Sequence, residues 1–281
     1  MMSALQDGAP AIDVSLTDAP AINWDRLRAD TERFKTEWRS SAPFPVVVID
    51  DFFDVGFAEQ LLRDFPKPDS DPIRRSRDYM FAANKFEKSD VGGVSPAFGR
   101  LESDLLSTAF SELLTEITGI DLRLDDSFHG GGLHMGGAGS YLDMHTDFNV
   151  HPLRPTWRRE ANVLIYLNPN WRPAYGGELK LRRGSTGVER KVEPLFNRCV
   201  IMSTGDDTIH GYDRIAFPQG EYRRSIAAYA YSVSNAPQSA ARSSVWYPEK
   251  GGAVKRLLGR AWPHLVRLKS CIVGSATAKN R

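Results

Sequence analysis

The sequence of 281 residues has two cysteines, too few for a disulfide framework, and neither of them stands in a CxxC pair. This scarcity argues against a disulfide-stapled secreted module and against a cysteine-ligated zinc site. The sequence also lacks a run of about 18 apolar residues, and its start is polar and acidic where a signal peptide would be basic and then apolar. Together these absences predict a cytoplasmic protein that does not span a membrane.

A strong charge of one sign is missing as well. The 36 Lys and Arg residues nearly balance the 35 Asp and Glu residues, and the formal net charge is +1. A field of one sign is what draws a protein toward polyanions, so no nucleic acid is expected as a partner. The hydrophobic fraction of 41% is ordinary for a soluble globular protein. One large domain with tails is the organisation that we expect.

Regular patterns begin after residues 1–20, which carry Pro, Asp and Ala without an apolar period and predict a flexible N-terminal tail. Helical spacing of apolar residues follows over residues 22–41. The β-branched run within residues 43–53 predicts a buried strand, and a short amphipathic helix follows it and stops at Pro66.

Residues 95–119 show the longest helical pattern of the chain. Ser95 is placed to cap its N-terminus, Pro96 to occupy its first turn, and Gly119 to end it. We therefore expect one long helix in this region.

Beyond residue 119 the apolar period becomes strand-like, and turns rich in Gly or Pro separate many short apolar runs. Such a series is typical of a β-sandwich or jelly roll. With the preceding helices packed outside one sheet, the predicted class is α+β, mainly β. The runs lie within residues 127–135, 140–148, 161–168, 177–183, 199–204 and 223–232.

Residues 237–281 form a basic C-terminal extension, because no acidic residue follows Glu249 and several Lys and Arg do. A basic amphipathic segment can lie on an anionic membrane surface or bind a partner. Pro263 interrupts the pattern, so a solvated, partly helical extension is favoured over membrane association. The sequence gives no indication of oligomeric state.

A metal site is indicated by His145, Asp147 and His210. Residues i and i+2 of a strand project from the same face, so His145 and Asp147 can offer a nitrogen and a carboxylate oxygen to one ion. His210 follows a strand-like run and is available to the same face of a closed sandwich. Two histidines and one carboxylate form a facial triad, which leaves half of an octahedral Fe(II) ion open for other ligands. For each residue taken alone, a surface or core hydrogen-bonding role is the alternative.

A carboxylate-binding residue is indicated where Arg223 and Arg224 open a strand that closely follows the second histidine. Consecutive strand residues point to opposite faces, so one of the two arginines faces inward. A planar guanidinium suits bidentate binding of a carboxylate. If Arg223 faces inward, Ser225, Ala227 and Tyr229 share its face. The alternative is that both arginines are surface charges.

Taken in order, these motifs resemble the Fe(II)/2-oxoglutarate-dependent dioxygenases, in particular bacterial members of the prolyl-4-hydroxylase-like branch. The resemblance covers roughly residues 43–234. It rests on HTD at 145–147, the later histidine at 210, the strand from 223, ANVLIYLNPNW at 161–171, GGELKL at 176–181, PFPVVVIDDFF at 43–53 and DDSFHGGGLHM at 125–135.

The resemblance implies a double-stranded β-helix, a cupin-like jelly roll, with iron at one open end. It implies that His145, Asp147 and His210 are the catalytic iron ligands and that a dioxygenase domain spans residues 21–236. The cofactors that it implies are Fe(II), 2-oxoglutarate as co-substrate and O2, with ascorbate as a reductant.

The same resemblance implies that Arg223 pairs with the distal carboxylate of 2-oxoglutarate and that Tyr166 donates its hydroxyl to that carboxylate. Asn162 shares a strand face with Tyr166 and is expected to line the same pocket. The interval between His210 and Arg223 is longer than in animal oxygen-sensing relatives. That difference leaves the choice between Arg223 and Arg224 open.

The implied reaction is hydroxylation of an amino acid, a related small metabolite or a peptidyl residue, with release of succinate and CO2. Gly130, Gly131 and Gly132 are expected to let a loop approach the site closely, and Asn149 and His151 to lie at its mouth. The alternative function is a noncatalytic metal-binding β-helix that binds a ligand or a partner. A retained 2-oxoglutarate clamp argues against that alternative, because a pure binding module has no need of one.

Overall fold

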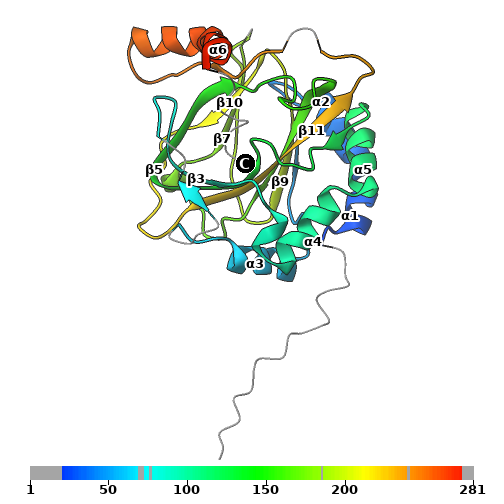
Figure 1. The fold of residues 1–281 in the computed structure, drawn as a ribbon. Helices are drawn as coiled ribbons and strands as arrows, with labels where there is room; N and C mark the ends of the chain where they lie inside the picture. The colour runs from blue at the N-terminus through cyan, green and yellow to red at the C-terminus, as the bar shows by residue number, and fades with distance from the viewer. Residues whose placement is uncertain (1–20, 69–72, 76–77, 185, 239–240, 274–281) are drawn as a thin grey trace, which may run out of the picture.

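The computed structural model describes residues 21–68, 73–75, 78–184, 186–238 and 241–273, so the predicted tail at 1–20 lies outside the described residues. The strands form one strongly curled antiparallel sheet, and most helices cover one side of it (Figure 1). The prediction of a mainly β jelly roll with N-terminal helices against one sheet is confirmed. The helices are α1 Trp24–Ala29, α2 Thr31–Ser40, α3 Val55–Asp64, α4 Pro96–Leu105, α5 Thr108–Thr118 and α6 Ala253–Val273, with single 3-10 turns at Gly92–Val94 and Pro173–Tyr175.

The sheet runs in the order β1-β9-β6-β11-β5-β10-β7-β8, and all of its pairs are antiparallel. Strands β3 and β12 also pair with β5, β4 pairs with β11, and β2 pairs with β3. The strands are β1 Val46–Ile49, β2 Arg74–Arg75, β3 Ala82–Lys88, β4 Arg123–Leu124, β5 Gly132–Thr146, β6 Trp157–Tyr166, β7 Leu179–Arg183, β8 Glu189–Val192, β9 Arg198–Ser203, β10 Thr208–Tyr212, β11 Arg223–Val233 and β12 Val245–Trp246.

Strand β5 belongs to both halves of the curled sheet. Its first half pairs with β11, up to Gly136, whereas its second half pairs with β10 and β12. Between the halves, residues 137–140 bulge out, because the partners of Gly136 and Tyr141 on β3 are only two residues apart. A bulge bends a strand, and this one directs the end of β5 toward β10.

Alternation along the central strands separates two apolar layers. Val163 and Ile165 of β6 pack beneath the helices in the large core cluster, together with side chains of α2, α4 and α5 such as Phe34 and Phe98. Tyr166, one residue further along, belongs to the smaller cluster on the concave side of the sheet. The helices therefore hold the convex face of the sheet, and the concave face is left for a cavity.

The helix expected over residues 95–119 is two helices. Ser95 caps α4 by accepting a hydrogen bond from the backbone N–H of Phe98, and Gly119 ends α5 in the left-handed conformation, both as predicted. The break falls at Ser107, which has an extended backbone. Its hydroxyl accepts a hydrogen bond from the backbone N–H of Phe110 and so caps the start of a new helix. An N-cap serine inside an apolar helical period is thus what divides the region.

The C-terminal region contributes to the sheet before it turns helical. Trp246 of β12 pairs with β5, and α6 then packs on β12 through Gly259, where a Cβ atom would lie 2.6 Å from the carbonyl oxygen of Trp246. The expected interruption at Pro263 was wrong, since α6 continues through it. Because proline has no backbone N–H, Pro263 cannot donate the helical hydrogen bond to the carbonyl of Gly259. The division of the chain after residue 236 stays a prediction.

Among the helices of the described residues, none is long and apolar enough to cross a membrane.

Candidate active site

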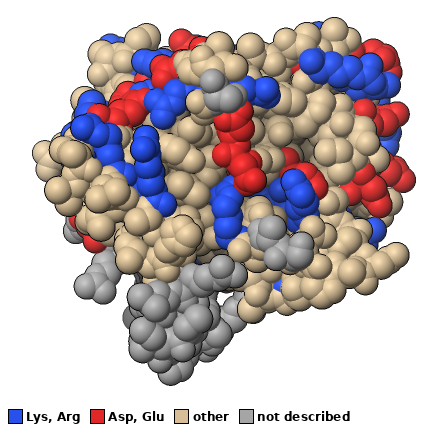
Figure 2. All heavy atoms as spheres, turned by 90° about the horizontal axis from the view of Figure 1, so that it is seen from above, with Lys and Arg blue, Asp and Glu red and all other residues tan. Residues whose placement is uncertain are grey.

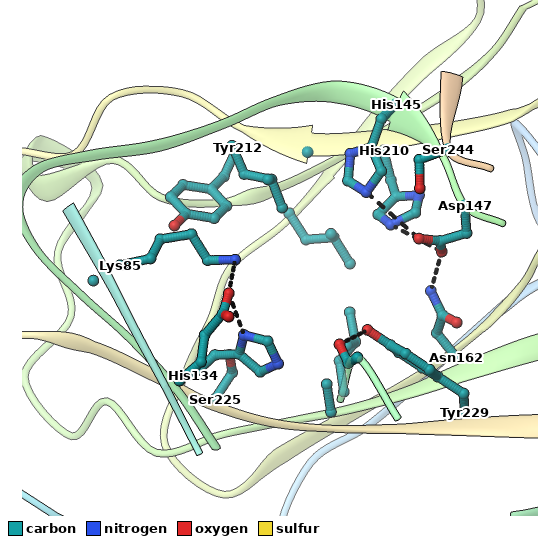
Figure 3. A pocket seen from close by; sticks show the side chains of 18 of the residues that line it. Lys85, His134, His145, Asp147, Asn162, His210, Tyr212, Ser225, Tyr229 and Ser244 are labelled. Atoms are coloured by element: carbon teal, nitrogen blue, oxygen red, sulfur yellow. Dashed lines mark hydrogen bonds and ion pairs between the residues drawn. The ribbon is translucent and has the colours of Figure 1, made fainter. Parts of the chain in front are cut away.

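Strand pairing brings the three candidate metal ligands together. His210 of β10 lies directly opposite His145 of β5, and their ring centroids are 4.4 Å apart. Asp147 directly follows the end of β5, with Oδ1 3.5 Å from Nε2 of His145 and Oδ2 3.4 Å from Nε2 of His210. One ligand atom from each residue lies within 4.8 Å of the others. Figure 3 shows the three side chains converging at one end of a pocket.

The hydrogen bonding of His145 suits metal binding. Its Nδ1 lies 3.0 Å from the backbone carbonyl oxygen of Asp143, and because a carbonyl only accepts, Nδ1 is the donor. In the neutral imidazole, Nε2 then presents a lone pair toward the Asp147 carboxylate. Two acceptors that face each other across 3.5 Å repel unless a cation lies between them. The donor set of two imidazoles and one carboxylate therefore fits Fe(II).

Asp147 is held by two donors on one oxygen. Nη2 of Arg159 and Nδ2 of Asn162 each lie 2.9 Å from Oδ2, and Nε of Arg159 donates to Oδ1 of Asn162, also at 2.9 Å. Burial by itself would raise the pKa of Asp147, but Arg159, His210 and His145 outweigh it and hold that pKa well below its usual range. The carboxylate is thus ionised and fixed in orientation before any metal binds.

His210 is kept neutral. Burial, the largest effect, lowers the pKa of His210 to about 3, although Asp147 beside it acts in the opposite direction. A neutral imidazole is the form that binds a metal. Trp246 stacks against the ring of His145 with 4.7 Å between centroids, and Nη1 of Arg242 donates to the backbone oxygen of Asp147 at 2.7 Å. Residues of the C-terminal region thereby cover the outer side of the triad.

Arg223 and Tyr166 mark a second part of the same cavity. Arg223 is 7% exposed, its Nε donates to the Gly177 carbonyl oxygen at 2.7 Å, and its Nη2 lies 3.4 Å from the Tyr166 hydroxyl. Burial raises the pKa of Tyr166, so its hydroxyl keeps its proton and can donate. The Arg224 side chain contacts the Tyr222 carbonyl oxygen at 3.5 Å instead and does not line the cavity. Of the two arginines, Arg223 is the one that faces inward.

The triad and Arg223 share one cavity of about 240 Å³. Its opposite wall carries Lys85 of β3, whose ammonium lies 3.0 Å from Oε1 of Glu87, and His134 of β5, whose Nδ1 lies 3.9 Å from the same oxygen (Figure 3). Tyr79, Trp246, Phe148 and Tyr229 supply aromatic lining. The cavity therefore combines an end that carries the candidate metal ligands, an end that carries Arg223, and an apolar wall with a few placed polar groups.

Several residues expected near a substrate have other positions. Gly130 lines the cavity, but Gly131 and Gly132 are required for packing, since a Cβ atom would lie 2.5 Å from the Ala227 oxygen and 2.2 Å from the Lys88 oxygen respectively. Oδ1 of Asn149 accepts a hydrogen bond from the backbone N–H of Arg242. His151 is buried with Nε2 3.3 Å from a carboxylate oxygen of Asp125. Neither of these two side chains lines the cavity.

Arg159 and Trp246 are site residues that the sequence patterns did not identify. Arg159 stands three positions before Asn162, so regular alternation would place it on the opposite face of β6. A β-bulge at Glu160 changes this, because Ala161 and Arg159 pair with consecutive residues of β11. A register break cannot be read from residue types alone. Trp246 lies in a two-residue strand without alternation, and a single tryptophan in a basic segment carries no signal of its own.

Comparison with known proteins supports the class that fold and site define. Residues 131–231 match the family model of the 2OG-Fe(II) oxygenase superfamily, a span that contains the triad and both arginines. No curated protein matches the sequence. The family-model match shows that this span resembles the 2OG-Fe(II) oxygenase superfamily, whose members use Fe(II), 2-oxoglutarate and O2.

Solved structures of prolyl hydroxylases share the fold. The chain is similar to a Trichoplax adhaerens prolyl hydroxylase in complex with a hypoxia inducible factor peptide fragment (TM-score 0.57, 16% identity, 74% of this chain and 91% of that chain). It is also similar to prolyl 4-hydroxylases from Pseudomonas putida (0.52, 17%, 71% and 98%) and Phytophthora capsici (0.54, 20%, 79% and 69%). These structures support the prolyl-4-hydroxylase-like fold. The family-model match is what supports a dioxygenase activity rather than a noncatalytic β-helix.

Proposed function

We propose that this protein is an Fe(II)- and 2-oxoglutarate-dependent hydroxylase in which His145, Asp147 and His210 hold the iron. Arg223 and Tyr166 bind the distal carboxylate of 2-oxoglutarate. The substrate is an amino acid, a related small metabolite or a peptidyl residue. The observation that carries the proposal is that the triad and the buried Arg223 line the same cavity.

Bound Fe(II) and 2-oxoglutarate supply the oxidising chemistry, in which O2 is consumed, succinate and CO2 are released, and a substrate C–H bond becomes C–OH. The residues of the chain orient the participants. His210 presents a neutral imidazole, His145 presents its Nε2 atom, and Asp147 presents a carboxylate held by Arg159 and Asn162. Trp246 lies over His145 and keeps that side of the metal site away from bulk water.

The 2-oxoglutarate site is proposed from its charge and its burial. Nε of Arg223 is committed to Gly177, which fixes the plane of the guanidinium and leaves its Nη atoms for a carboxylate. The Tyr166 hydroxyl beside Nη2 adds a neutral donor to the same position. A dicarboxylate whose other end lies at the metal site would be held at both ends, which would orient it for reaction.

The test is succinate formation by the purified protein with Fe(II), ascorbate, O2 and 2-oxoglutarate, in the absence and presence of a panel of amino acids and peptides. The His145→Ala variant is expected to abolish turnover. The matched control is His264→Ala, since His264 lies exposed on α6, and it is expected to behave as wild type. Absence of both turnover and 2-oxoglutarate binding in the wild type would reject the proposal and favour a noncatalytic metal-binding module.

A further inference from the structure

Arg159 lines the cavity, and one of its hydrogen-bond donors has no role in the proposed chemistry. Its side chain is 1% exposed, Nη2 bonds Asp147 and Nε bonds Asn162. Its Nη1 is buried and has no hydrogen-bond partner among the described residues. An unmet donor on a buried guanidinium is costly, which makes it a marker for a missing acceptor.

The backbone is shaped to put this arginine there. The extra residue Glu160 breaks the register between β6 and β11, so that Arg159 lies opposite Tyr231 and on the cavity side. Bulges beside active sites commonly re-aim a side chain in this way. The guanidinium packs against two rings, with its carbon 3.3 Å from the centroid of Tyr229 and 4.7 Å from that of Phe148. Both rings line the cavity, so the fixed group borders the space that a substrate would enter.

The charges of the cavity point to the kind of acceptor. The charged residues that line it are Lys85, Arg159 and Arg223 against Glu87 and Asp147, which leaves one positive charge. The two charges of Fe(II) and the two of 2-oxoglutarate offset each other. The loaded site thus keeps one excess positive charge, in a buried place where an unpaired charge is unfavourable.

Other groups in the cavity leave this excess unchanged. Burial, the largest cause, lowers the pKa of His134 to about 4, so this residue is neutral at pH 7. Lys85 is already paired with Glu87 at 3.0 Å. Arg223 is the proposed partner of 2-oxoglutarate. Arg159 is therefore the cation whose free hydrogen-bonding edge matches the excess charge.

We infer that the primary substrate is a small molecule with one carboxylate, which accepts a hydrogen bond from Nη1 of Arg159 while Nη2 keeps its bond to Asp147. This inference rests on the proposed function. The arginine would hold the substrate carboxylate and the metal-ligating carboxylate on two edges of one planar group, and so fix the distance between substrate and metal. Arg159 is thereby a specificity-determining residue as well as a positioning residue for Asp147.

The experiment is calorimetric binding to the protein loaded with Mn(II) and 2-oxoglutarate without oxygen. The probes are the twenty proteinogenic L-amino acids and their primary amides, which lack only the carboxylate charge. We expect at least one acid to bind about 10- to 100-fold more tightly than its amide, the cost of one charge-assisted hydrogen bond. Equal binding of acid and amide, or no binding by any acid, would overturn the inference.

Two variants separate the role of Arg159 from a general structural effect. Arg159→Lys keeps the positive charge but replaces the planar guanidinium, which can bond two carboxylates along two edges. This variant is expected to lose most of the acid-to-amide preference. The neighbouring Arg158, whose side chain is 57% exposed, gives the matched control Arg158→Lys, which is expected to keep the preference. Loss of the preference in both variants would contradict the assignment. Binding of 2-oxoglutarate itself is measured first, because its absence would reject the proposed function instead.

Discussion

Replacing Arg223 by Ala is expected to weaken 2-oxoglutarate binding far more than the same change at Arg224. Arg223 is 7% exposed and faces the cavity with its Nη atoms, so a carboxylate bound there forms a buried, charge-assisted pair. Truncating one partner of such a pair costs about 2–5 kcal/mol. At about 1.4 kcal/mol for each factor of ten, the dissociation constant should rise about 30- to 4,000-fold.

Arg224 provides the control at the adjacent position. Its side chain lies on the other face of β11, 5.7 Å from the Tyr222 ring centroid. Arg224→Ala is expected to change 2-oxoglutarate affinity by no more than about twofold, the usual size of a surface substitution. The pair of variants therefore tests which face of the strand carries the clamp.

The assay is calorimetric titration of 2-oxoglutarate into the Mn(II)-loaded protein. Arg223→Ala also removes the hydrogen bond to Gly177, so its thermal unfolding is measured alongside and the titration is run well below that transition. Equal and small effects of the two substitutions would refute the clamp assignment. A large effect at Arg224 alone would show that the side-chain directions of β11 are reversed.

Three further predictions concern the surroundings of the site. Asn162→Ala removes a donor to Asp147 and should weaken Mn(II) binding about 10- to 100-fold, whereas unchanged metal affinity would assign the amide another role. The lowered pKa of His134, about 4 against an ordinary 6.5, means that the unfolded chain binds more protons between these values. The free energy of unfolding should therefore fall as pH drops from 6.5 toward 4, and a His134→Gln variant measured by urea titration should show a flatter profile; an identical slope would refute this. Gly132→Ala places a Cβ atom 2.2 Å from the Lys88 oxygen at a φ of +93°, and a loss of more than about 1 kcal/mol in the free energy of unfolding is expected; unchanged stability in the same titration would show that β3 yields easily.

The parts of the site that could be predicted are those that depend on regular strands. His145 and Asp147 were predicted because an i, i+2 pair shares a strand face, and His210 because a strand-like run precedes it. The same rule says that only one of Arg223 and Arg224 faces inward. Which of the two does so depends on how β11 pairs with its neighbouring strands. Only the observed strand register, with Arg223 opposite Gly136, shows that Arg223 is the inward-facing residue.

The parts that could not be predicted depend on breaks in regularity. The bulge at Glu160 reverses the facing of Arg159, and the capping hydroxyl of Ser107 splits a continuous apolar period into α4 and α5. Trp246 reaches His145 through a pairing between residues that are far apart in the sequence. Each of these features is decided by tertiary contacts, which local spacing does not encode.

Surface charge gives no additional signal about a partner. On the face seen from above in Figure 2, Lys and Arg are interspersed with Asp and Glu. Pairs such as Arg182 with Glu249 and Arg242 with Asp206 are of this kind. Opposite charges side by side screen one another at a distance, so the expectation that nucleic acid is not a partner stays a prediction in line with this face.

The stacking of Trp246 on His145 limits how far the protein can be truncated at its C-terminal side. A fragment limited to residues 131–231 would encode every proposed ligand of iron and 2-oxoglutarate, yet it would end before Arg242, which bonds the Asp147 backbone, and before Trp246. The proposed metal site would then be exposed to solvent on that side. A shortened fragment should therefore begin at Ala21, because α1 and α2 contribute buried side chains to the core, and should extend at least through Gly259, where α6 packs against Trp246.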